Sequence, residues 1–352
     1  MRPTPLSVWL VGIAAVTGCG AGPSGPAQVC SAAVARGCWE SLGLDGHHVT
    51  AVTATPMGIF AGDFSEGVFR LDSAVGSWVS LGVDHAIVSS LLYVPGDTAR
   101  LLVGVWPQDR EETAAAVFAT EDGGETWKPW DGGLADQSND QRFWAFSLAV
   151  DLGNPRRLFM GSSAAILRSP DGGGTWEFAF GGPTSSALGV LGIAISPRRD
   201  GNLWAGGESP FFTGYVRHSS DWGDSWQHVE VNVAAITVLA IDPDAPEVLW
   251  AGAPGGIMSS LDNGETWEVR LRGLIVGGIV FIDSGAYVFG TELPEVRIDG
   301  HLMAFQSLDR GEHWEPLPVP ADVQGAIAVS VDQLGRVLVG TSGSGVWRYT
   351  PE

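Results

Sequence analysis

The chain has 352 residues and a formal net charge of −21, from 19 lysine and arginine residues against 40 aspartate and glutamate residues. A chain this acidic does not neutralise phosphates, which argues against nucleic-acid binding through a basic face. Hydrophobic residues make up 45% and charged residues 17%, a composition that excludes general disorder. Glycine and tryptophan, with 49 and 15 copies, recur at regular intervals. This regularity, more than the length, indicates how many domains to expect.

Residues 1–18 have the features of a leader rather than of a folded segment. Arg2 gives a short positive start, and Leu6 to Val16 is an apolar run too short to cross a bilayer. The run closes with Val16-Thr17-Gly18-Cys19, which resembles the bacterial lipobox. The resemblance implies cleavage before Cys19, acylation of its sulfur, and an address at the outer membrane or cell surface with lipid as the only membrane attachment. An ordinary secretory signal beside an incidental cysteine is the alternative.

Residues 19–37 are expected to form a flexible tether, because Gly20 to Ala27 is uncharged and rich in glycine and proline. Cys30 and Cys38 remain once the leader is removed, and outside the cytoplasm such a pair is usually oxidised. A Cys30–Cys38 disulfide would pin the tether to the domain, and two free thiols are the alternative. Residues 38–352 are expected to fold as a single monomeric domain.

An eight-residue pattern, Ser/Thr-x-Asp-x-Gly-x-Thr-Trp, occurs five times after a degenerate copy that ends at Trp78. The closing tryptophans, counted from Trp78, are 41 to 50 residues apart. The fifth copy has His313 where the others have threonine or serine. The aspartates of the five copies are Asp122, Asp171, Asp221, Asp262 and Asp309.

The pattern resembles the Asp-box, or BNR, repeat of sialidases, sortilin-type receptors and many bacterial propellers. Its aspartate can accept hydrogen bonds from the backbone N–H groups of a tight turn, and its glycine supplies the positive φ that the turn needs. The tryptophan opens the next strand and buries its ring between neighbouring sheets. These aspartates are therefore expected to hold turns together rather than to catalyse a reaction.

Each unit between boxes contains four short strands in about 40 to 50 residues, which is the spacing of a β-propeller blade. The last unit stops after its third strand, and Trp39 to Gly43 resembles the fourth strand Trp78 to Gly82. We predict an all-β, seven-bladed propeller of four-stranded blades, closed by the N-terminal strand near Trp39 pairing with the C-terminal blade. Six blades without this closure are the alternative. The units are 47–82, 84–131, 142–181, 188–231, 234–271, 274–317 and 325–350.

Loops that join the second strand to the third are expected on the face opposite the boxes. Those of alternate units are long, at 106–112, 208–215 and 292–299, and the linker 131–142 reaches the same face. Aromatic and charged side chains there suit a glycan or a protein ligand. Solvated loops without a ligand are the alternative. The candidate binding residues are Trp106, Arg110, Trp144, Phe212, Tyr215 and Arg297.

Motifs for chemistry are scarce, and we predict neither a metal site nor a cofactor. The sequence has no His-Glu-x-x-His pair and no Gly-x-Ser-x-Gly elbow, and His47 and His48 are expected to begin a strand. The likeness to sialidases stops at the boxes, because Phe69-Arg70-Leu71-Asp72 lacks the expected proline and no arginine cluster is evident.

We therefore expect a lipid-anchored binding or scaffold propeller rather than an enzyme. One alternative is a glycoside hydrolase that uses carboxyl groups in the central funnel, with Asp63, Glu208 and Glu292 as candidates. A second is an assembly factor like the photosystem-type Asp-box proteins, which present a basic patch. With Lys128 as its single lysine, this chain offers little support for such a patch.

Overall fold

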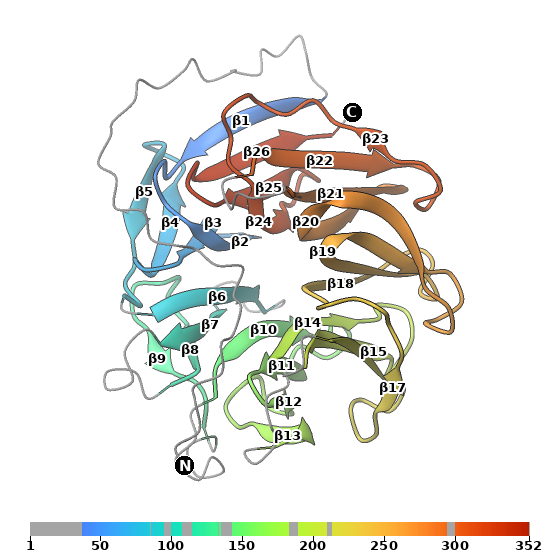
Figure 1. Cartoon of the computed structure of the whole chain (residues 1–352). Helices are drawn as coiled ribbons and strands as arrows, with labels where there is room; N and C mark the ends of the chain where they lie inside the picture. The colour runs from blue at the N-terminus through green and yellow to red at the C-terminus, as the bar shows by residue number, and fades with distance from the viewer. Residues whose placement is uncertain are drawn as a thin grey trace, which may run out of the picture.

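The computed structural model describes residues 37–84, 86–94, 100–107, 115–132, 134, 143–182, 189–209, 213–293 and 300–351. The named elements in these ranges are all β-strands, and they form six antiparallel sheets. Figure 1 shows the sheets arranged around a common centre, which makes the molecule an all-β propeller.

Four sheets consist of four consecutive strands, with the innermost strand first. They are β2–β5 (Val49–Thr55, Gly58–Asp63, Val68–Asp72, Ser77–Ser80), β6–β9 (Ala86–Tyr93, Leu101–Pro107, Val117–Thr120, Lys128–Pro129), β10–β13 (Ala145–Val150, Leu158–Ser162, Ala165–Ser169, Glu177–Gly181) and β14–β17 (Gly189–Ile195, Leu203–Glu208, Gly214–Ser219, Gln227–Val229).

The fifth sheet has six strands, and the sixth, called here the terminal sheet, joins both ends of the domain. The fifth contains β18 (Val238–Ile241), β19 (Leu249–Ser260), β20 (Glu268–Ile282), β21 (Gly285–Glu292), β22 (Leu302–Ser307) and β23 (Glu315–Pro316). The terminal sheet contains β24 (Ala326–Val331), β25 (Val337–Thr341), β26 (Val346–Thr350) and β1 (Cys38–Gly43).

The prediction of seven separate blades was wrong, because units 234–271 and 274–317 share the six-stranded sheet. β19 pairs with β18 near its start, from Leu249 to Gly252, and with β20 near its end. β20 in turn pairs with β21 from Leu274 onward. Both long strands thus change partner along their length without a break. This sheet supplies two of the innermost strands, and the inner strands contact one another in the order β2, β6, β10, β14, β18, β20, β24 and again β2.

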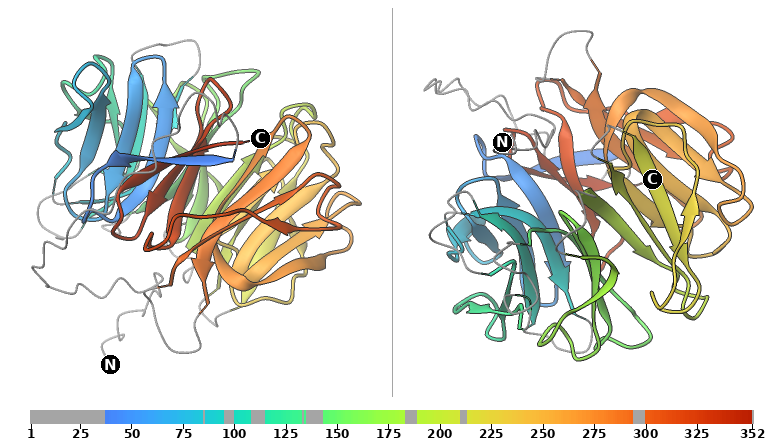
Figure 2. Two further views of the ribbon diagram at one scale, coloured as in Figure 1. Left: turned by 90° about the horizontal axis from the view of Figure 1, so that it is seen from above. Right: turned by 60° about the horizontal axis from the view of Figure 1, so that its bottom comes forward.

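The two ends of the domain meet in the terminal sheet. β1 pairs antiparallel with β26, from Cys38 opposite Thr350 to Gly43 opposite Val346. In both views of Figure 2 the blue β1 lies beside the red C-terminal strands. Cys38 is disulfide-bonded, and the other two cysteines, Cys19 and Cys30, lie outside the described residues. The pairing of Cys38 with Cys30 therefore stays a prediction.

The core consists of side chains packed between neighbouring sheets. The second strand of each sheet supplies much of it, and β11 and β25 are buried along their whole length. Trp204 of β15 and Trp250 of β19 are fully buried, each packed against side chains of the next sheet or sheet segment. No helix in the described part of the chain is long and apolar enough to cross a membrane.

The five aspartate motifs form turns of one geometry, called here the Asp turns, between the third and fourth strands. In the first, Thr120 Oγ1 donates to Asp122 Oδ1 at 2.7 Å and accepts from the backbone N–H of Gly124 at 2.8 Å. The backbone N–H of Thr126 donates to Asp122 Oδ1 at 2.9 Å. The other four turns repeat these contacts.

Tryptophans at the start of fourth strands link several sheets by hydrogen bonds to the backbone of the preceding sheet. Trp78 Nε1 donates to Leu42 O at 2.7 Å, and Trp127 Nε1 donates to Leu81 O at 2.8 Å. Trp176 donates to Trp130 O at 3.1 Å, and Trp39 to Pro318 O at 2.8 Å. Within the described ranges, the equivalent Nε1 atoms of Trp226, Trp267 and Trp314 are buried without a hydrogen-bond partner.

Arginines bridge the two junctions on either side of sheet β14–β17. Arg168 of β12 donates to Trp222 O at 3.3 Å and pairs with Asp224 in the next Asp turn. On the other side, Arg199 Nη1 donates to Asn263 Oδ1 at 2.9 Å, and Arg198 pairs with Asp244 at 2.6 Å.

The antiparallel order of strands gives the molecule two distinct faces. Asp turns, and turns from first to second strands, lie on one side, called here the Asp-turn face. Loops from second to third strands, and from sheet to sheet, lie on the opposite side, called here the rim face.

Candidate functional site

Several predicted site residues come to the rim face at equivalent places in different sheets. Trp106, Glu208 and Glu292 each lie two residues after a glycine of a second strand. Trp106 and Glu208 are opposite the start of an innermost strand, and Glu292 is opposite Leu274, where β20 begins to pair with β21. Phe64 has the same place after the second strand of sheet β2–β5. The ends of the second strands therefore arrange aromatic and acidic side chains around one face.

Two of the predicted binding residues pack directly against each other. The rings of Trp106, at the end of β7, and Trp144, just before β10, stack with centroids 5.1 Å apart and an interplanar angle of 26°. Both residues are half-buried, so each stays partly exposed to solvent. Stacked aromatic rings offer a flat apolar surface, and such a surface can hold a ligand with an apolar face.

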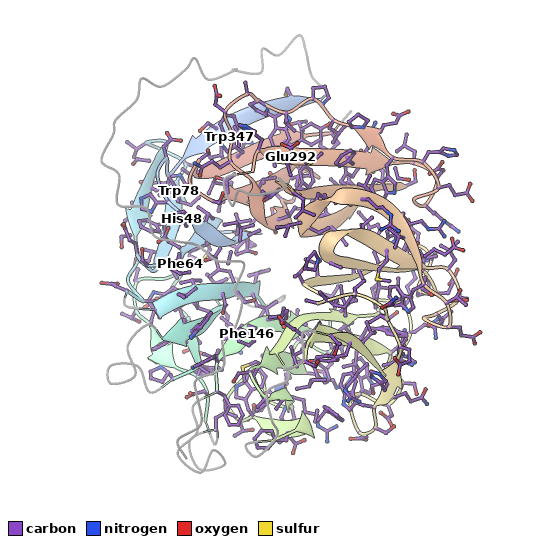
Figure 3. All side chains as sticks on the ribbon, viewed as in Figure 1. His48, Phe64, Trp78, Phe146, Glu292 and Trp347 are labelled. Carbon is purple, nitrogen blue, oxygen red and sulfur yellow. The ribbon has the colours of Figure 1, made fainter. Side chains whose placement is uncertain are left out.

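Phe146 completes this aromatic cluster, although sequence analysis did not select it. Its ring lies edge-on to Trp106, with centroids 6.0 Å apart, and 6.3 Å from the ring of Trp144. A β-bulge explains its place: Ala145 pairs with Ser162 and Ser147 with Gly161, which leaves Phe146 between the two pairs. Bulges of this kind redirect a side chain. Figure 3 shows Phe146 toward the centre of the ring.

A signal for Phe146 was present in the run Phe143-Trp144-Ala145-Phe146. Strand alternation places residues 144 and 146 on one side and residue 143 on the other. Phe143 is indeed buried, and its ring packs 5.4 Å from that of Phe178.

Asp63 is engaged in holding its own loop. Its Oδ1 accepts from the backbone N–H groups of Ser65 at 2.8 Å and Glu66 at 2.9 Å. Its Oδ2 lies 3.3 Å from Nδ1 of His47, and its side chain is 4% exposed. A buried carboxylate with these partners organises the rim rather than meeting a ligand.

Glu208 and Glu292 remain as carboxyl groups at the rim. Glu208, at the end of β15, is half-buried, and burial raises the pKa of its carboxyl group above the ordinary value. Glu292, at the end of β21, is exposed (Figure 3). A carboxyl group with a raised pKa can act as a general acid, and among these two residues Glu208 has that property.

Tyr215 is less accessible than a ligand-contacting residue would be. It is 4% exposed, and its hydroxyl donates to Gly189 O at 3.4 Å. Burial raises the pKa of this phenol, which therefore stays protonated. Arg217 stacks 3.8 Å over the ring of Phe180, and burial lowers the pKa of its guanidinium group.

Arg110, Phe212 and Arg297 lie outside the described residues. They remain candidates on the strength of the sequence alone, as does the lipid attachment at Cys19.

One group of possible metal ligands occurs among the described residues, and it lies on the Asp-turn face. It consists of Asp309, Glu312 and His313, all exposed. Two of them already make the contacts of their turn, since His313 Nδ1 and Asp309 Oδ2 are 2.7 Å apart.

No protein-family model matches this chain. An oligoxyloglucan-reducing end-specific xyloglucanase from Emericella nidulans is 26% identical over 198 residues, which are 52% of this chain and 24% of that protein. The match thus spans about a quarter of the curated relative.

Solved structures share the propeller fold. A GH74 xyloglucanase from Xanthomonas campestris has a TM-score of 0.67 and 18% identity, covering 88% of this chain and 53% of that one. YCF48 bound to a D1 peptide has a TM-score of 0.64 and 14% identity, covering 89% and 97%. The extracellular domain of BT3049 from B. thetaiotaomicron, a putative hybrid two-component system, has a TM-score of 0.66 and 14% identity, covering 88% and 41%. At these identities the likeness concerns the fold.

Proposed function

We propose that this protein is a lipid-anchored Asp-box propeller that binds a glycan on its rim face. The aromatic cluster of Trp106, Trp144 and Phe146 carries the proposal, because it offers a partly exposed stack at the end where the second strands finish. The xyloglucanase relative makes xyloglucan the first ligand to test.

Binding would be measured by isothermal titration of the protein with xyloglucan oligosaccharides, and with unbranched cello-oligosaccharides for comparison. Trp106→Ala and Trp144→Ala should each weaken binding at least tenfold, or about 1.4 kcal/mol, because they remove the stacking surface. Leu293→Ala, at an exposed rim position outside the cluster, should bind like the wild type. Wild-type affinity in both tryptophan variants would contradict the proposal, and binding of peptides in place of glycans would favour a protein partner.

Hydrolysis is the second candidate, and the raised pKa of Glu208 supports it. In this mechanism Glu208 protonates the leaving oxygen while Glu292 acts as base or nucleophile. Release of new reducing ends from xyloglucan should then disappear in Glu208→Gln and persist in Glu265→Gln, which alters an Asp turn on the other face. No release by the wild type would leave binding as the function.

Membrane attachment through Cys19 belongs to the same proposal. Cys19→Ser should move the protein from the membrane fraction to the soluble fraction after cell lysis. Retention of this variant in the membrane fraction would refute a lipid anchor at this residue.

A further inference from the structure

Most of the large apolar side chains that are exposed in the described chain lie on turns of the Asp-turn face. Of nine large apolar residues exposed in the described chain, six lie on turns between first and second or between third and fourth strands. Leu308 and Leu334 are 68% and 76% exposed, and each projects from a turn of a different sheet. The six are Met57, Val75, Leu152, Leu261, Leu308 and Leu334.

The N-terminal segment enters the fold at the same face. β1 is the fourth strand of the terminal sheet, and fourth strands begin where the Asp turns end. Cys38, its first residue, pairs with Thr350, the last residue of β26. The chain that leads from Cys19 therefore reaches the domain on the Asp-turn face.

The length of that segment limits how far the two can separate. Residues 20–37 number 18, and a chain of 18 residues spans at most about 65 Å when fully extended. A disulfide between Cys38 and Cys30, the pairing predicted from the sequence, would shorten this reach. An anchor at Cys19 would thus tether the domain by its Asp-turn face.

We propose that the Asp-turn face rests on the bilayer that holds the Cys19 lipid, with its apolar turn residues at the lipid surface. The rim face, with Trp106 and Trp144, then points away from the membrane toward external polymers. This inference depends on the proposed lipid anchor, and it does not depend on what the rim binds.

Charge limits the kind of bilayer that suits this face. The chain carries a net charge of −21, and each of the five Asp turns contributes an aspartate to this face. Anionic headgroups would repel these carboxylates, whereas zwitterionic headgroups would not. The face is therefore expected to contact neutral lipid.

The test uses the full lipidated chain reconstituted in phosphatidylcholine vesicles. Leu308→Cys and Leu334→Cys on the Asp-turn face, and Leu293→Cys on the rim face, are labelled with an environment-sensitive fluorophore. All three positions are exposed leucines, so labelling should leave the fold intact. Spin-labelled lipid should quench the fluorophore strongly at 308 and 334 and weakly at 293, and added phosphatidylglycerol should reduce the quenching at 308.

Equal or stronger quenching at 293 would overturn the proposed orientation. So would stronger quenching on anionic than on neutral vesicles. Failure of the full chain to associate with the vesicles would instead refute the lipid anchor on which the orientation rests. If the expected quenching pattern accompanies a lack of glycan binding, the proposed rim function fails while the orientation stands.

Discussion

The last polar position of the Asp turn is filled by a hydroxyl group in four turns and by the ring of His313 in the fifth. In the first four Asp turns a threonine or serine hydroxyl donates to the aspartate, as Thr175 Oγ1 does to Asp171 Oδ2 at 2.8 Å. In the fifth, the His313 ring takes this place, 2.7 Å from Asp309 Oδ2. Hydrogen bonds from His313 lower the pKa of Asp309 to about 2, and Asp309 raises the pKa of His313 above 6.5.

These shifts predict a pH dependence with a definite sign. A raised histidine pKa stabilises the fold fully below the unfolded pKa of 6.5, and this contribution is lost as the pH rises through the folded pKa. A hydroxyl donor does not titrate in this range. Melting curves from pH 5.5 to 8.5 should therefore show wild type losing stability relative to His313→Thr as the pH rises. Parallel curves for the two proteins would contradict this prediction.

At the scale of elements, the glycine of an Asp turn has two roles: it adopts the positive φ of the turn, and it leaves room for a tryptophan ring from another sheet segment. Gly311 has φ +82°, and a Cβ there would lie 2.0 Å from the ring of the fully buried Trp250. Gly76, in the turn between β4 and β5, has a similar φ of +71° but open space around it.

Alanine substitutions at these two glycines distinguish the cost of backbone strain from the cost of a steric clash. Gly76→Ala should destabilise the fold by about 1 kcal/mol, from the left-handed backbone alone. Gly311→Ala adds overpacking and should cost about 3 kcal/mol or more. Urea unfolding monitored by tryptophan fluorescence would measure both. If Gly311→Ala were as stable as Gly76→Ala, the ring of Trp250 would be able to move aside without measurable cost in stability.

The sequence predicted the local elements well and their division into sheets less well. Turn chemistry is local, so Asp122 and its equivalents could be recognised from spacing, and the structure gives all five the expected contacts. Whether β19 and β20 break or continue depends on how two units pack, which no short pattern encodes. The site divides in the same way. Trp106 and Trp144 could be selected as aromatics near predicted loops, and alternation places Phe146 on the side of Trp144. The stacking of Trp106 on Trp144 joins two sheets, which the sequence of neither sheet encodes.

At the scale of the whole molecule, β1 joins residues that are far apart in sequence. Trp39 is 4% exposed, packs against Phe289 and Tyr349, and donates to Pro318 O at 2.8 Å. Arg348 of β26 pairs with Glu40 beside it. These contacts hold the fourth strand of the terminal sheet to the rest of the molecule.

Removing the ring of Trp39 tests that role. Trp39→Ala should destabilise the protein by about 3 to 5 kcal/mol, the usual cost of deleting a buried aromatic side chain. Val79→Ala, at an exposed position of an outer strand, should change stability by less than about 0.5 kcal/mol. Equal unfolding midpoints for the two variants in urea would mean that β1 is dispensable.

The junctions between sheets are also of two kinds. Sheets β2–β5, β6–β9 and β10–β13 are tied to their predecessors by hydrogen bonds from half-buried or buried indole groups, which carry no net charge for salt to screen. On either side of β14–β17 the indole nitrogens lack partners, and exposed arginine pairs bridge the gaps instead. Because exposed ion pairs weaken as ionic strength rises, we expect concentrated salt to destabilise these two junctions before the others. The propeller would thus have two junctions whose stability follows the ionic strength of its surroundings.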